Sequence, residues 1–312
     1  EEETTYTASV SVSDGINSVS QNITINIKDV DDNAPEIKTA ANYNVLEGES
    51  FIGFVKASDI DSTNLIFSSN LSEIEIDASS GAMAFTITTD VNDQKTYNPV
   101  ITVSDGTNST SIRLTINVRE VGENAPDLFI SEFGGRTHLE IFNATGADIN
   151  LNDYALTNVT NDPSVIGEYE YWLTGTSIFG NNLLIKNGET LLICSTNIND
   201  DLKEYCDSLY QYFGNGDDAY QLVKGSEASY EILDVIGDFN GDPGRGWSVC
   251  GVEEATVGVI NKKSNYFGTP DWDNSRGTNA ENCHWTIEEE WSPGSHSFTT
   301  FSPVITSESI FE

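Results

Sequence analysis

The feature that most constrains the fold is an internal repeat with a fixed offset of 91 residues. Residues 5–37 align without a gap with residues 96–128, and 16 of the 33 positions are identical. This period is too long for one unit of a solenoid or propeller, which spans roughly 20–50 residues. It is close to the length of one β-sandwich domain of about 100 residues. We therefore expect a complete repeat over residues 36–126 and the C-terminal part of a preceding repeat over residues 1–35.

The pattern inside the repeat is that of antiparallel strands. Apolar and polar side chains alternate over residues 23–27 and 112–118, as they do when one face of a strand is buried. Asp-Gly pairs at residues 14–15 and 105–106 mark turns between such runs. Residues 36–126 contain no helical periodicity of useful length. The sequence predicts an all-β fold of tandem immunoglobulin-like antiparallel β-sandwiches.

The two repeats meet at the run DVDDNAP, residues 29–35, which crowds four oxygen-bearing side chains into five positions. Oxygen ligands at this density suit a hard cation, Ca²⁺ before Mg²⁺, because Ca²⁺ accepts about 6–8 oxygens in a flexible shell. Pro35 keeps the residue before it extended, so the run reads as a link between domains. The alternative is an acidic turn on the surface.

The charge balance of the chain narrows the choice of partners. The net charge is −36 at pH 7, which argues against nucleic acid and anionic membranes, since both need a basic face. So negative a charge is compatible with binding of divalent cations, or with solubility in a salty extracellular medium. No apolar run approaches the ~18 residues of a membrane span, and no signal peptide is visible. We expect the chain to be an excised piece of a longer secreted or cell-surface protein.

Four cysteines lie in the C-terminal half, and none forms a CxxC motif. With the three histidines scattered, a zinc site is not expected. The even number indicates two disulfides formed in an oxidising compartment. Three connectivities are possible. We favour Cys194–Cys206 with Cys250–Cys283, because the first pair closes a short strand-to-loop segment.

Residues 1–126 resemble cadherin repeats, and several motifs in the right order carry the resemblance. The run at residues 29–35 is similar to the DxNDNAP linker of the family, with Asp31 in place of Asn. Residues 59–61 resemble its DxD motif, and residues 103–106 its AxDxG motif. Glu47 matches an acidic residue near the start of a repeat, and Glu1 stands where the Glu of the DxE motif is expected.

The cadherin resemblance implies a Ca²⁺ cluster at the junction between the repeats. The ligands it implies are Asp31 and Asn33 bridging to Asp59, Asp61 and Asp105, with Glu1, Val30 (through its carbonyl) and Asp32 facing the first repeat. The second linker, residues 120–126, has Gly122 at a ligand position, and the DxE counterpart at residues 90–92 is weakened. The second junction is therefore expected to bind Ca²⁺ poorly, or to hold one ion at most.

The composition changes after Asp127, where all tryptophans and cysteines lie. We expect strands at 128–133 and 138–143, and a short helix within residues 200–212. Residues 127–298 resemble the lamin-tail domain, which implies a second immunoglobulin-like sandwich that contacts a partner; residues 299–312 are expected to be a linker. The motifs that carry the resemblance are ISEF at 130–133, EIFN at 140–143, Leu151 with Tyr154, GDDAYQL at 216–222, and the stretch from 234 to Trp247.

Sites of other kinds have weaker support. Residues 238–244 place Asp, Asn and Asp like the first ligands of an EF-hand loop, but Pro243 and Val249 break that pattern, so a tight turn is favoured. No GxSxG or HExxH motif occurs, and we expect no enzyme activity in this chain. Tyr169, Tyr171 and Trp172 have the chemistry to stack on a sugar, although a core role is favoured for Trp172.

The function expected from the sequence is a calcium-binding extracellular adhesion or spacer segment. The cadherin resemblance implies calcium-dependent cell adhesion, homophilic adhesion included, and the lamin-tail resemblance implies a protein or glycan partner. One alternative is a non-catalytic accessory region of a secreted hydrolase such as an extracellular nuclease. Another is a carbohydrate-binding module.

Overall fold

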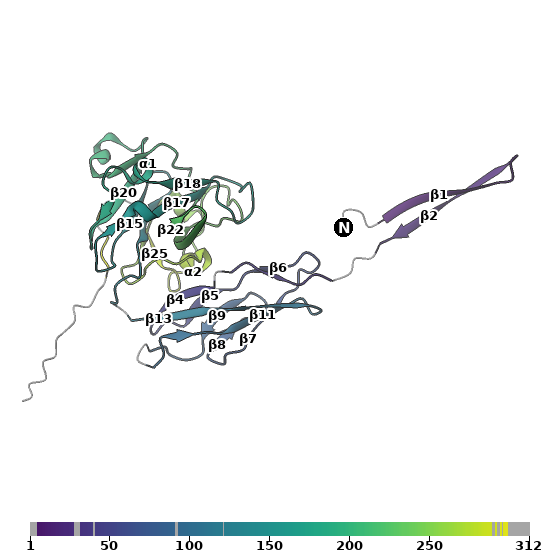
Figure 1. The fold of residues 1–312 in the computed structure, drawn as a ribbon, viewed down its shortest axis with the longest axis horizontal. Helices are drawn as coiled ribbons and strands as arrows, with labels where there is room; N and C mark the ends of the chain where they lie inside the picture. Colours follow the sequence, from purple (N-terminus) through teal and green to yellow (C-terminus); the bar gives the residue numbers. More distant parts are fainter. Residues whose placement is uncertain are drawn as a thin grey trace, which may run out of the picture.

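A computed structural model of the chain describes residues 5–27, 32–39, 41–90, 93–120, 122–288, 291, 294 and 296–298. The fold is all-β, with short helices between many strands, as the sequence predicts. Figure 1 shows an isolated hairpin, a first sandwich and a second sandwich that lies against the first. No helix among the described residues is long and apolar enough to cross a membrane.

The hairpin pairs β1 (Thr5–Ser13) with β2 (Ser18–Asn26) in antiparallel register from Thr5↔Asn26 to Ser13↔Ser18. All residues of both strands are exposed, and the hairpin stands apart from the sandwiches in Figure 1. Tyr6, Val10 and Ile25 are 45–53% exposed, whereas their counterparts 91 residues later are at most 4% exposed in a core. The hairpin therefore carries core-type side chains of a repeat. Its assignment to a preceding domain stays a prediction.

The first sandwich consists of short sheets around one apolar core. Its fully buried residues include Tyr43, Ile52, Met83, Ile101 and Ile116. One pairing, between the strands at 42–46 and 115–119, is parallel. The strands are β3 (Glu36–Ile37), β4 (Asn42–Leu46), β5 (Phe51–Phe54), β6 (Ala57–Ser58), β7 (Ile66–Ser69), β8 (Ile74–Ile76), β9 (Ala82–Phe85), β10 (Thr96–Tyr97), β11 (Val100–Ser104), β12 (Ser109–Arg113) and β13 (Thr115–Arg119).

The second sandwich packs a six-stranded sheet against a four-stranded sheet around the largest core of the described residues. Their strand orders are β21-β20-β15-β14-β24-β25 and β18-β17-β22-β23, and β16 pairs with β19. The strands are β14 (Phe129–Gly134), β15 (His138–Phe142), β16 (Ile149–Asn150), β17 (Tyr154–Val159), β18 (Tyr171–Thr174), β19 (Leu184–Ile185), β20 (Thr190–Ser195), β21 (Ser208–Tyr210), β22 (Ala219–Ser226), β23 (Ser229–Ile236), β24 (Val259–Lys262) and β25 (Trp285–Glu288).

Helices are few and short. The helix expected within residues 200–212 is a 3₁₀ segment, η2 (Asp200–Tyr205), because Cys206 turns into extended backbone. The others are η1 (Leu151–Asp153), α1 (Thr176–Phe179), η3 (Ala255–Val257) and α2 (Trp272–Arg276). The favoured disulfide pairing is confirmed, since Cys194 bonds Cys206 and Cys250 bonds Cys283.

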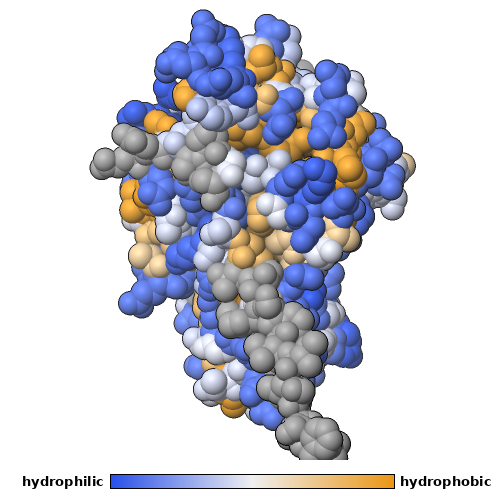
Figure 2. All heavy atoms as spheres, turned by 90° about the vertical axis from the view of Figure 1, so that its left-hand side faces the viewer, coloured by the Kyte–Doolittle hydropathy of each residue, from blue (hydrophilic) through white to orange (hydrophobic). Residues whose placement is uncertain are grey.

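The surface is largely hydrophilic, as the many acidic and polar residues of the sequence lead one to expect. Figure 2 shows hydrophilic residues over most of one face, with hydrophobic residues gathered mainly on the upper part, where the second sandwich lies. Some of the few basic residues are placed inside instead. Lys262 on β24 is buried with its Nζ 2.6 Å from Oδ2 of Asp234 on β23, and both side chains are fully enclosed.

The Asp234 carboxylate also organises the backbone around this ion pair. It accepts hydrogen bonds from the amides of Ile130 at 2.9 Å and Thr269 at 3.2 Å. The Lys262 ammonium lies 4.5 Å from the centre of the Trp285 ring. Three segments of the second sandwich thus meet on one carboxylate.

Removing the charge of Lys262 is expected to weaken the second sandwich strongly. Lys262→Met keeps the apolar stem but leaves Asp234 buried without its counter-ion, so the free energy of unfolding should fall by about 3–5 kcal/mol in urea titrations. Lys186→Met is the matched control, since Lys186 is 61% exposed in its pair with Glu189 and should cost less than about 1 kcal/mol. Equal losses in the two variants would refute the importance of the buried pair.

Candidate metal site at the first junction

Three segments converge where the first linker enters the first sandwich. The linker residues Asp32 and Asn33 precede β3, while Asp59 and Asp61 lie just after β6. Because β3 pairs with β6 through Glu36↔Ser58, the linker and the Asp59 loop must be neighbours. Asp105 lies in the turn between β11 and β12.

Asp61 holds the linker by its carboxylate. Its Oδ2 accepts hydrogen bonds from the amides of Asp32 at 3.3 Å and Asn33 at 3.0 Å, and from Nδ2 of Asn33 at 2.5 Å. These bonds, that of the Asn33 side chain first, lower the pKa of Asp61 below its ordinary value of 3.8. The carboxylate is therefore ionised at neutral pH.

Asp59 uses only one of its two oxygens within the protein. Its Oδ1 accepts hydrogen bonds from the amides of Asp61 at 2.8 Å and Ser62 at 3.0 Å, which closes a tight turn. Its Oδ2 is buried and has no hydrogen-bond partner among the described residues. A buried polar oxygen without a partner carries a desolvation cost of about 1–3 kcal/mol, more when charged.

Asp105 repeats this arrangement in another loop. Its Oδ1 accepts hydrogen bonds from the amides of Thr107 and Asn108, both at 2.6 Å, and its Oδ2 is buried without a partner in the described structure. Asn108 also ties this turn to the linker, because its Nδ2 donates to the carbonyl of Asn33 at 2.8 Å. The two loops and the linker are thus joined by protein contacts.

These residues fit a hard cation in part. Two unpartnered carboxylate oxygens and the neighbouring amide side chain of Asn33 are the donor types that Ca²⁺ takes. No group of three His, Cys, Asp or Glu side chains within the described ranges is arranged to hold a metal ion. The predicted ligands Glu1, Val30 and Asp31 lie outside the described residues.

At the second junction, apolar residues of the linker and of both sandwiches pack against one another. Ala125 of its linker is buried against Leu46 of the first sandwich and Phe142 and Phe267 of the second. Across the same interface the hydroxyl of Tyr266 donates a hydrogen bond to Glu49. No local sequence pattern in either sandwich predicts this contact.

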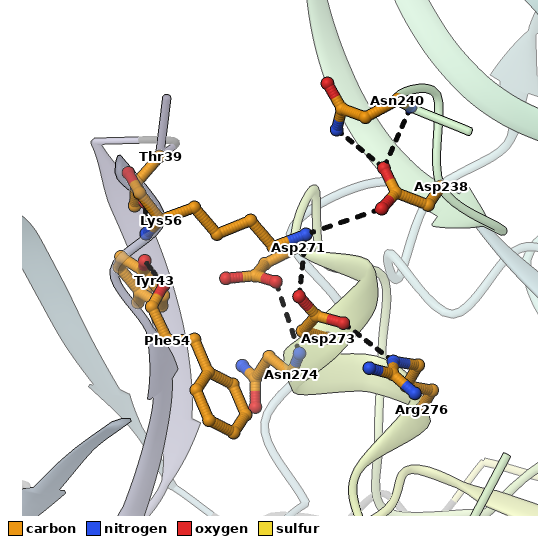
Figure 3. Close-up of polar contacts among 10 residues, drawn as sticks. All are labelled: Thr39, Tyr43, Phe54, Lys56, Asp238, Asn240, Asp271, Asp273, Asn274 and Arg276. Atoms are coloured by element: carbon orange, nitrogen blue, oxygen red, sulfur yellow. Dashed lines mark hydrogen bonds and ion pairs between the residues drawn. The ribbon is translucent and has the colours of Figure 1, made fainter. Parts of the chain in front are cut away.

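An ion pair completes this interface (Figure 3). Nζ of Lys56 in the first sandwich lies 2.6 Å from Oδ2 of Asp273 at the start of α2 and 4.0 Å from Oδ2 of Asp238. Burial opposes the charge of Lys56, but Asp273 and its neighbours outweigh burial and raise the pKa of this lysine. The other oxygen of Asp238 accepts the amide of Asn240 at 3.0 Å, as in the tight turn favoured for residues 238–244.

Comparisons with known proteins give no family for this chain. No family model matches, and no curated protein matches. Similar solved structures include human mucin-like protocadherin EC1-2, with 17% identity, a TM-score of 0.32 and coverage of 38% of this chain and 70% of that one. The third cadherin domain of human protocadherin 7 has 13% identity, a TM-score of 0.28 and coverage of 32% and 97%. Protocadherin gamma C5 EC1-3 has 21% identity, a TM-score of 0.30 and coverage of 37% and 43%.

The interface predicts a pH dependence of stability. Burial raises the pKa of Asp271, which caps α2, to about 6 from 3.8. Because its pKa is raised, the Asp271 carboxyl binds its proton more tightly in the folded than in the unfolded chain, and protonation stabilises the fold. This contribution to the free energy of unfolding is complete below about pH 3.8 and is lost as the pH rises through about 6. The loss should be about 3 kcal/mol.

Asp271→Asn should remove this part of the pH dependence. The amide oxygen can still accept the cap bond from the Asn274 amide, which is 3.2 Å long. Urea titrations between pH 4 and 7 should give a shallower decline of the unfolding free energy than in the unsubstituted chain. Asp162→Asn, on an exposed loop, should leave the decline unchanged. Parallel curves for all three proteins would contradict the assignment to Asp271.

Proposed function

We propose that this chain is a non-catalytic, calcium-stiffened spacer of an extracellular or cell-surface protein, with the cation at the junction before β3. The observation that supports it is the pair of buried oxygens, Asp59 Oδ2 and Asp105 Oδ2, which have no hydrogen-bond donor among the described residues. Both belong to carboxylates whose other oxygen is fixed by a turn, so their positions are set before any ion arrives.

Bound Ca²⁺ would supply positive charge between carboxylates that otherwise repel one another. Asp59, Asp61, Asp105 and Asn33 would hold it together with the predicted ligands Glu1, Val30, Asp31 and Asp32. Because the ligands come from the linker and from two loops of the sandwich, binding would fix the linker against the first sandwich. Extracellular modules bind Ca²⁺ at about 10⁻⁴–10⁻³ M, so the joint would be filled only in calcium-rich surroundings.

The rest of the chain supports a location outside the cell and a role in contacts between proteins. The two disulfides fit an oxidising compartment. In this proposal the hairpin and the first sandwich are consecutive cadherin-like repeats and residues 127–298 form a lamin-tail domain that presents a contact surface. Calcium-dependent adhesion is the activity that the cadherin-like arrangement would serve.

Calcium is expected to stabilise the first sandwich through this site. At Ca²⁺ near 100 times its dissociation constant, the free energy of unfolding should rise by about 2.7 kcal/mol. Asp105→Asn and Asp59→Asn should each remove most of this gain, because the amide keeps the turn bonds to Oδ1 but not the second anionic oxygen. Calorimetric unfolding with EGTA and with added CaCl₂ measures the effect.

Asp14→Asn is the matched control for these variants. Asp14 forms the same turn in the hairpin, where its Oδ1 accepts the amides of Ile16 at 2.8 Å and Asn17 at 2.7 Å. It is remote from the linker segment before β3, so its substitution should leave the response to Ca²⁺ intact. Identical unfolding with and without Ca²⁺ in the unsubstituted chain would refute the calcium site.

A further inference from the structure

The open edge of the second sandwich contains a cavity that the spacer function does not use. It has a volume of about 470 Å³ and lies between β18, an edge strand of the four-stranded sheet, and β21, an edge strand of the six-stranded sheet. Its walls are formed mainly by tyrosine rings and short polar side chains. The lining residues are Asn158, Thr160, Tyr171, Leu173, Ser177, Tyr210 and Tyr212.

The aromatic walls come from both sheets. Tyr171 on β18 stands directly opposite Asn158 on β17, so both side chains lie on the same face of their sheet. Tyr210 ends β21, and its ring centre lies 5.8 Å from that of Tyr212 in an edge-to-face arrangement. Tyr171 is 53% and Tyr212 67% exposed, which leaves much of both rings open to solvent.

A buried polar group lines the same cavity. Asn158 is only 1% exposed, and its Oδ1 has no hydrogen-bond partner among the described residues. Burying a polar oxygen without a partner costs about 1–3 kcal/mol, so folding alone does not favour a carboxamide here. A carboxamide offers both an acceptor and two donors to a ligand that enters the cavity.

We propose that this cavity binds a neutral saccharide. A sugar ring has an apolar face that packs on tyrosine and hydroxyl groups that hydrogen-bond to the Asn158 carboxamide. None of the residues that line the cavity is charged, and the chain carries a net charge of −36, which disfavours an anionic ligand. A cationic ligand would find no carboxylate in the lining. This proposal does not depend on the calcium site.

Saturation-transfer NMR on the whole chain tests the proposal with glucose, galactose, N-acetylglucosamine and cellobiose as probes. At least one should receive saturation, both with Ca²⁺ and with EGTA. Tyr171→Ala and Asn158→Leu should weaken its binding at least ~10-fold, since they remove the stacking ring and the polar partner. Tyr205→Ala is the matched control, because Tyr205 is 54% exposed and lies outside the lining; binding to this variant should be unchanged.

Thermal unfolding separates loss of binding from loss of fold. Asn158→Leu replaces an unsatisfied buried carboxamide by an apolar side chain of similar size, so its midpoint should equal or exceed that of the unsubstituted chain. Absence of binding for every probe, or unchanged binding in Tyr171→Ala and Asn158→Leu, would overturn the proposal. Saturation of a tyrosine-containing peptide but of no saccharide would do the same and would mark a pocket for an aromatic side chain.

Discussion

The interaction on which the arrangement of the domains depends is the pairing of buried and half-buried carboxylates with positive charge. At the second junction the protein supplies that charge itself, since Lys56 reaches across to Asp273 at 2.6 Å beside an apolar cluster. At the first junction Asp59 and Asp105 each keep a buried oxygen that no described donor reaches. Because such oxygens are costly without a partner, the proposed function assigns a cation to the first joint, whereas contacts within the protein hold the second.

This difference between the joints has a mechanical consequence. The second sandwich is fixed to the first by contacts from several segments: the linker at Ala125, the aromatic residues at 266 and 267, and the start of α2. The described residues of the two sandwiches are therefore held together across the second junction by contacts within the protein. In the proposed function, only the joint before β3 responds to Ca²⁺, and the response changes the angle and stiffness at one place.

Local sequence patterns predicted the fold class well, whereas contacts between segments far apart in the sequence could not be predicted from them. The repeat and its alternation predicted the all-β fold, and the cysteine spacing pointed to the disulfides that form. The motifs pointed to Asp61 and Asn33, whose side chains hydrogen-bond to each other. Lys56 and Asp273 are 217 positions apart, and no local pattern connects them. The unpartnered oxygen of Asn158 appears only once β17 is packed in the sandwich.

The chain has too few basic residues to neutralise its carboxylates, which favours the binding of cations from the solvent. The chain has 14 Lys and Arg against 50 Asp and Glu, and several of the lysines are held in contacts within or between the sandwiches. Lys262 is enclosed with Asp234, Lys56 bridges the sandwiches, and Lys224 lies 2.6 Å from Asp127 beside the second linker. Basic side chains used in this way cannot also neutralise the loops at the first junction. Self-repulsion of this size opposes compact folding unless ions from the solvent reduce it. In the proposed function, a cation held by Asp59, Asp61 and Asp105 together with the linker ligands would reduce this repulsion at a place where two of the three carboxylates already have one oxygen fixed by a turn.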